Sequence, residues 1–454
     1  MHVNSLFSKQ SEINKDNLGE AIQQAIEIEI ATIPVYLYTY YSINRVPNQD
    51  VISGTLSRAL VKEGVPVAEA NTIALDLSAE IMVFANKAGA LIMSVAIEEM
   101  LHMALSSNLK QALAGNPQLV GKTPSVWPTC LPGHQPEFPI NRDRLSQAQL
   151  RTFLKIESPY ELKDKLLLQA PIPYKTIGQF YEMLTDFIGH NELYYNTHSP
   201  QLIPGKGYYA QNNIDTVYYD KKHNPRFVNS EDSGDLVYVQ DQESALKAIN
   251  IIVEQGEGHK GASGLNPDGS PKCELVSADY DDESMTELSH FEKFARVYCR
   301  YERLTAKFNA LGIGDIDISS YFVNNVPLNP STADYPANIQ PVSNLLNAVY
   351  TYIFVMTEGC YKQGGNTQYE IFMFGIHKSM IFILNSLCGD IMKLSYTDKK
   401  GNTYAVAPTF EDYPFGLLSS PKDQLIALYK AAVAVYPAIS YLEPRFPVLP
   451  DVAL

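Results

Sequence analysis

Residues able to hold a metal ion gather in the segment EEMLH, residues 98–102 of a 454-residue chain that has nine histidines. Glu99 and His102 are three residues apart, so their side chains converge on one face of a helix. That face also carries apolar residues such as Ile92 and Val95, whereas Glu98 projects aside, toward solvent or a neighbouring helix. Di-iron carboxylate bundles hold their metals with such a Glu-x-x-His pair. The pattern predicts Glu99 and His102 as ligands and catalytic residues.

A further carboxylate is expected on an earlier helix, predicted from residue 17 to about residue 41. Glu29 projects within its apolar stripe of isoleucines, whereas Glu27 projects with polar neighbours. A carboxylate on a buried face is costly unless it is paired or coordinated. Tyr36 shares the stripe of Glu29, and it either packs in the core or tunes redox chemistry beside a metal.

Later helices must supply the remaining ligands. The helix that starts near Asp241 ends in VEQGEG, where Glu257 projects nearer the apolar stripe than Glu254 does. His290 shares a face with Phe294 on the next helix and could be the second histidine. The alternative interpretation is a capped helix end and a hydrogen-bonded core histidine.

One carboxylate position has two candidates. Glu157 lies in FLKIESP, at the end of an apolar run, and Glu182 lies in IGQFYEMLTDF, within a helix of full length. We favour Glu182 for that reason, and either residue could serve. Glu358 and His377, on two apolar helices near the C-terminus, form either a second polar site or a buried pair.

The elements that must position these residues are helices. Apolar periodicity and turn signals predict mainly α structure with long irregular insertions. Besides residues 17–41, helices are expected over residues 76–114, 343–362, 369–394 and 422–436, and around residues 150, 182, 248 and 295, with a strand near residues 235–241.

Six segments resemble, in content and order, the ferritin-like domain that opens the iminophenyl-pyruvate dimer synthases of violacein and rebeccamycin pathways. The segments are AIEIEIATIPVYLYTYYSI, SVAIEEMLHMALSSNLKQALAGNPQL, FLKIESP, TIGQFYEML, AINIIVEQGEG and ELSHFEKF, and they lie between about residues 17 and 303. The resemblance implies a ferritin-like bundle with a carboxylate–histidine iron site. It implies as ligands Glu29, Glu99, His102, Glu257 and His290, and it leaves Glu157, Glu182 and Glu254 as ligands or as neighbours of ligands.

Composition limits the classes of binding partner and the cellular compartment that can be expected. The net charge of −15, without a compensating basic block, argues against nucleic-acid binding. Five scattered cysteines without a CxxC pair suggest reduced thiols in a cytoplasm. The N-terminal residues show no signal-peptide core, and the apolar segment 371–392 contains charged residues, so it is interpreted as a buried helix. We therefore expect a soluble cytoplasmic protein without a membrane or nucleic-acid partner.

The sequence is interpreted as two regions, a ferritin-like metal-binding domain over residues 1–330 and a helical region over residues 331–454 packed on the bundle. The expected function is that of a non-haem di-iron oxidoreductase, with manganese as the other metal choice. It would use O₂ or peroxide to oxidise a small organic substrate, such as an amino-acid-derived imine of secondary metabolism. The alternative is a non-catalytic ferritin-like protein that binds or stores metal, and a homodimer is compatible with either.

Overall fold

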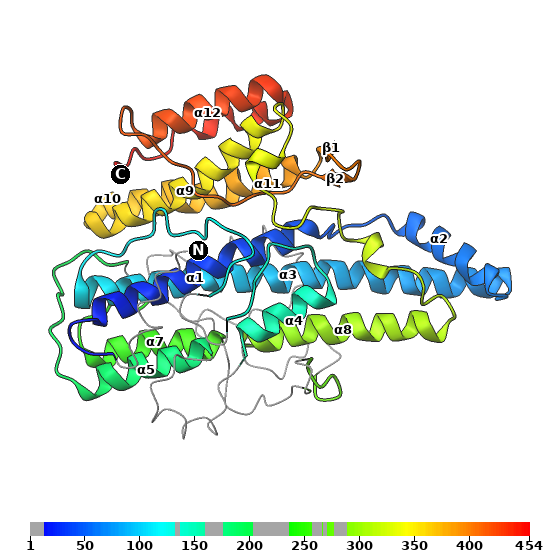
Figure 1. Ribbon diagram of the computed structural model, residues 1–454, viewed down its shortest axis with the longest axis horizontal. Coiled ribbons are helices and arrows are strands. Elements are labelled where there is room, and N and C mark those ends of the chain that lie inside the picture. The colour runs from blue at the N-terminus through cyan, green and yellow to red at the C-terminus, as the bar shows by residue number, and fades with distance from the viewer. Residues whose placement is uncertain are drawn as a thin grey trace.

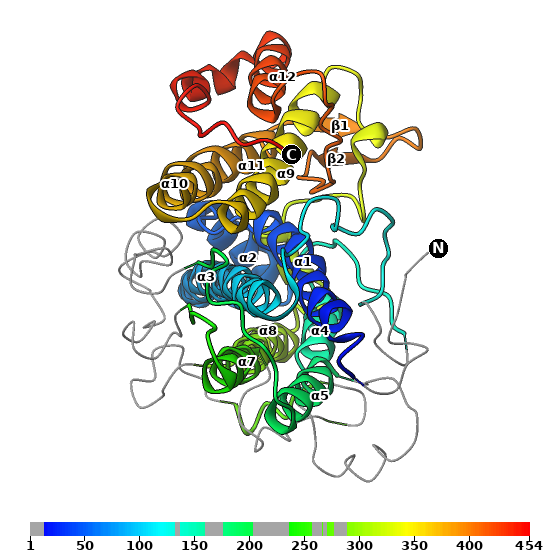
Figure 2. The same ribbon diagram turned by 90° about the vertical axis from the view of Figure 1, so that its left-hand side faces the viewer.

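The computed structural model describes residues 13–131, 137–158, 176–202, 236–256, 266, 270–276 and 288–454. In these residues the chain is mainly helical, as the sequence predicts, and its helices lie in three layers (Figures 1 and 2). Helices α1 (Leu18–Ser42) and α3 (Val67–Ala114) form the middle layer. Other helices cover its two faces (Figure 2).

The middle layer is built from two long helices that pack along each other. Helix α2 (Gln49–Lys62) starts at Asn48, whose side chain accepts from the Val51 backbone N–H, and it packs on the first part of α3. Helix α3 stops at Gly115, whose φ of 85° is a conformation that glycine adopts at little cost. Most side chains between residues 84 and 112 of α3 are buried, because other helices pack on both of its faces.

Among the described residues, the second layer consists of four shorter helices, and caps define where three of them start. They are α4 (Gln147–Ile156), α5 (Ile177–His190), α7 (Gln242–Gly256) and α8 (His290–Ala310). The Ser146 side chain caps α4, and Thr176 and Ser289 form capping boxes at the starts of α5 and α8. The Ser289 cap makes His290 the first residue of α8.

The third layer lies on the opposite face of α1 and α3 (Figure 2). Its central helix is α9 (Gln340–Lys362), which packs against α12 (Pro421–Val435) and against two π-helical segments, η5 (Ile371–Ile376) and η6 (Ser379–Leu384). The Tyr361 hydroxyl joins this layer to α3 by donating to the Ala104 carbonyl. The remaining elements are η3 (Ile318–Tyr321), η4 (Thr332–Asp334), α10 (Gly365–Glu370), α11 (Asn385–Ile391), the antiparallel strands β1 (Ser395–Thr397) and β2 (Thr403–Ala405), and η7 (Pro437–Arg445).

Some expected boundaries are wrong. Helix α2 and the β1–β2 hairpin were not anticipated, α3 starts at Val67 rather than near residue 76, and residues 236–240 form no strand. Two helices, Val67–Ala114 and Gly365–Ile391, are long and apolar enough to cross a membrane. Their most apolar windows are 72% and 56% buried in the fold, and core helices share this composition, so the finding is weak evidence for a membrane span.

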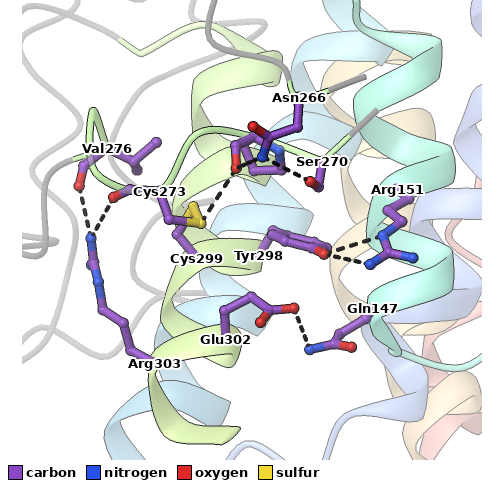
Figure 3. The surroundings of a disulfide bond; sticks show 11 residues. Gln147, Arg151, Asn266, Ser270, Cys273, Val276, Tyr298, Cys299, Glu302 and Arg303 are labelled. Carbon is purple, nitrogen blue, oxygen red and sulfur yellow. Dashed lines mark hydrogen bonds between the residues drawn. A yellow bond between two sulfur atoms is a disulfide. The ribbon is translucent and has the colours of Figure 1, made fainter. Parts of the chain in front are cut away.

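A disulfide corrects the expectation of reduced thiols. Cys273 is bonded to Cys299 of α8, and Figure 3 shows the segment around Cys273 attached to that helix. Arg303 strengthens the attachment by donating to the carbonyls of Cys273 and Val276. The free cysteines of the described residues are Cys130, Cys360 and Cys388.

Candidate metal centre

Five carboxylate and imidazole side chains meet where the middle layer faces the second layer. Each is at most 4% exposed. Helices α1 and α3 supply three of them, and the other two lie at helix ends, one at the C-cap of α4 and one at the first position of α8. The five are Glu29, Glu99, His102, Glu157 and His290.

Glu99 lies between the two imidazoles. Its Oε1 is 3.0 Å from Nδ1 of His290, and its Oε2 is 3.9 Å from Nδ1 of His102. Each imidazole also faces a second carboxylate, because His102 Nδ1 is 3.9 Å from Glu29 and His290 Nδ1 is 3.6 Å from Glu157. The two rings stack with centroids 5.1 Å apart. The cluster therefore has two similar halves that share Glu99.

The outer nitrogen of each imidazole has its own partner. His102 Nε2 lies 3.0 Å from the Gln255 side-chain oxygen, near the end of α7. His290 Nε2 lies 2.8 Å from Glu98, and the Lys293 ammonium donates to the same carboxylate over 2.6 Å. Such outer partners fix the tautomer and the orientation of an imidazole, which leaves its other nitrogen free to bind a metal.

Two tyrosines donate hydrogen bonds to Glu29 and Glu157, the outer carboxylates of the cluster. The Tyr36 hydroxyl donates to Glu157, and the Tyr181 hydroxyl donates to Glu29. Tyr36 is fully buried and packs edge-on against Phe153, with ring centroids 4.8 Å apart. The Thr32 hydroxyl lies 3.2 Å from Glu99, so every carboxylate of the cluster accepts at least one hydrogen bond.

Burial and crowding separate the pKa values of these groups. Burial and the adjacent Glu99 raise the pKa of Glu29 well above its ordinary value, and burial also raises that of Glu157. Burial acts in the same direction on Glu99, but its contacts with Glu29 and His290 outweigh it and lower the pKa of Glu99 to about 2. The cluster therefore resists full ionisation when no cation is present.

The two imidazoles also differ from each other in the direction of their pKa shifts. Burial lowers the pKa of His102 to about 4. Burial acts in that direction on His290 as well, but its contacts with Glu157, Glu98 and Glu99 raise its pKa well above the ordinary value.

The donor set fits a metal ion. Its oxygen and nitrogen donors, without a thiolate, suit iron or manganese. Nδ1 of His290 is buried, and although it lies 3.0 Å from Glu99 it makes no hydrogen bond of acceptable geometry. Among the described residues, the ligand atoms of Glu99, His102 and His290 lie within 4.8 Å of one another. If two ions bind, Glu29 would be available to the ion on the His102 half, and Glu157 would be available to the ion on the His290 half.

Several sequence-based expectations need correction. The carboxylate seen in the cluster is Glu157, 3.6 Å from His290, whereas on α5 it is Tyr181, the residue before Glu182, that contacts Glu29. Glu254 is exposed, and its neighbour Gln255 faces His102 instead. Glu257 lies outside the described residues.

Glu98 was expected to project aside, toward solvent or a neighbouring helix. It is 7% exposed and contacts both His290 and Lys293 of α8. The helical phase of Glu98 is the one anticipated, but that side of α3 is covered by α8.

Comparison with known proteins identifies the family of this chain. The model of the family described as Ferritin-like matches residues 22–299, which is more than half of the chain. The chain belongs to the Ferritin-like family. A solved structure of a ferritin-like protein from Caulobacter vibrioides is similar at 16% identity with a TM-score of 0.42, covering 82% of this chain and 95% of that one. No curated protein matches this ferritin-like chain.

The family match starts within α1, covers α3 and ends within α8, so all five residues of the cluster lie inside it. It supports a di-iron type of fold in general terms. The roles of the individual residues as ligands stay predictions.

Proposed function

We propose that this ferritin-like protein is a non-haem oxidoreductase with two metal ions, iron by preference and manganese as the alternative. The observation that carries the proposal is the fully buried cluster in which one carboxylate, Glu99, faces two imidazoles through its two oxygens. A carboxylate with that environment is suited to bridge two ions, while Glu29 and Glu157 each complete one half. Bound iron would supply the electrons for reduction of O₂ or peroxide.

The residues around the cluster prepare it for that role. The outer contacts with Gln255 and Glu98 hold both imidazoles with Nδ1 inward. The hydroxyls of Tyr36 and Tyr181 hold a proton close to each outer carboxylate and keep these carboxylates oriented. Tyr36 therefore stands where a proton could move to or from Glu157.

We propose a small organic substrate, with an amino-acid-derived imine of secondary metabolism as the class to test first. Support for this class comes from the order of the six sequence segments that resemble the dimer-synthase domain. The buried, aromatic surroundings of Tyr36, formed by Phe153 and Phe294, favour a reaction shielded from water.

Two measurements on the purified protein test the proposal. We expect two iron ions per chain by elemental analysis, and consumption of O₂ by the reduced protein that accelerates when candidate imino acids are added. Two bound ions without any substrate-dependent O₂ consumption would instead indicate a metal-storage role. A chain that binds no metal would exclude both functions.

A further inference from the structure

An apolar cavity lies on the other face of the α1–α3 layer, between these helices and the third layer. Its volume is about 60 Å³. Helix α1 contributes Ile33 and Leu37 to its wall, α3 contributes Met103 and Ala104, and α9 contributes Phe354. The middle layer therefore has the metal cluster on one face and this cavity on the other.

The cavity wall is largely apolar, and only Tyr350, Thr357 and His377 among its lining residues carry a polar side-chain group. One water molecule needs roughly 10–15 Å³ of such space and two to four polar partners. The cavity is large enough, but the Thr357 hydroxyl in its wall already donates to the Ile353 carbonyl over 2.8 Å. The Tyr350 hydroxyl accepts from Thr123, and His377 is half-buried. A space lined in this way favours an apolar occupant.

The wall opposite the bundle comes from the two π-helical segments. Ile376 of η5 and Met380 of η6 both line the cavity, on either side of His377. π-Helical turns are rare and occur often at functional sites. Methionines such as Met380 and Met103 adapt their shape to a small ligand more readily than branched residues do. His377 lines this cavity. Glu358, the other residue of the second polar site or buried pair considered from the sequence, accepts hydrogen bonds from the backbone N–H groups of residues 119 and 120.

The cavity and the cluster are one residue apart along both helices. Ile33 in the cavity wall follows Thr32, which contacts Glu99, and Met103 follows His102. We infer that the cavity is a binding site for a small apolar molecule of the size of O₂ or xenon, and that O₂ is its occupant. The assignment of O₂ rests on the proposed function, whereas the apolar site itself does not.

Xenon tests the site independently of any activity. We expect ¹²⁹Xe NMR on the full chain to show one saturable site in the wild-type protein. Ala104→Val fills the cavity from α3 and Leu37→Phe fills it from α1, so each should abolish that binding. Ala68→Leu, on an exposed part of α3, is the matched control and should retain it. The inference is overturned if the wild-type protein binds no xenon, or if a correctly folded filled variant binds it as the wild-type protein does.

The dependence of O₂ consumption on O₂ concentration tests the occupant. For the iron-loaded Ala104→Val variant we expect a several-fold higher O₂ concentration at half-maximal rate, with the maximal rate unchanged. An unchanged O₂ dependence would overturn the assignment of O₂. If the wild-type protein consumes no O₂, the proposed function and the O₂ assignment fail together, while the xenon result still decides whether the apolar site exists.

Discussion

The two halves of the candidate metal centre have the same inner donors and different outer partners. Each half contains one imidazole and one outer carboxylate, and both share Glu99. Behind His102 lies a neutral amide, Gln255, whereas behind His290 lies a carboxylate, Glu98. An anionic acceptor makes an imidazole more basic than a neutral one does. The two metal positions are therefore expected to differ in their affinity for the metal ion, although their ligands are of the same types.

The largest effect should follow from the residue that the halves share. We expect Glu99→Ala to remove both ions, with a loss of affinity well beyond the roughly 10–100-fold effect typical of outer partners. Elemental analysis of the purified variant measures it. Glu27→Ala is the matched control on the outer side of α1, where Glu27 pairs with Lys122 over 2.7 Å. Retention of one ion by Glu99→Ala would show that Glu99 belongs to one half only.

Variants that remove a ligand from only one half of the centre should lose about half as much metal. We expect His102→Ala and His290→Ala each to lower the metal content from two ions per chain to about one, because each imidazole faces a different outer carboxylate. Native mass spectrometry of the loaded variants gives the stoichiometry directly. If either variant loses both ions, the two positions are filled cooperatively and do not act as separate halves.

The division between the halves also shows what the sequence could predict. Glu29, Glu99 and His102 lie inside long continuous helices, where a period of 3.6 residues fixes the direction of each side chain. That periodicity was sufficient to place them on buried faces. The ferritin-like fold followed from the same helices and from the order of the six segments.

Two residues that the sequence left open or missed lie where helices end. Glu157 follows the last turn of α4, and Gln255 is the second-to-last residue of α7. At such positions the backbone leaves the helical path, so periodicity no longer sets the direction of a side chain. Glu98 points to a neighbouring helix, one of the two directions anticipated, and the sequence does not show that this helix is α8. Tyr181, within α5, could have been found from its phase with Leu184 and Ile188.

A smaller effect should come from the outer partners. Glu98→Gln combined with Lys293→Met removes the carboxylate and its buried counter-ion together, so that no unpaired charge remains in the core. We expect this double variant to weaken the ion on the His290 half by about 10–100-fold. Gln255→Ala should weaken the ion on the His102 half, and by less, because it removes a neutral hydrogen bond. Isothermal titration with metal resolves the two binding steps, and equal changes in both variants would contradict the difference between the halves.

The smallest expected effect concerns the metal-free protein, in the way its free energy of unfolding depends on pH. The pKa of His102 is lowered to about 4, from about 6.5 in an unfolded chain. The unfolded chain therefore binds a proton between these values while the folded chain does not, and stability falls as the pH falls. The loss is about 1.36 kcal/mol per pH unit within that window.

His290 should act with the opposite sign. Its pKa is raised in the folded chain, so its contribution is full below about pH 6.5 and is lost as the pH rises through the folded pKa. We expect His102→Gln to reduce the loss of stability between about pH 6 and 5, where the carboxylates with lowered pKa values, Glu98 and Glu99, remain ionised. His290→Gln should alter the slope above pH 6.5 instead. Urea unfolding with chelator at a series of pH values measures both slopes, and parallel curves for the two variants would mean that their outer partners do not distinguish the imidazoles.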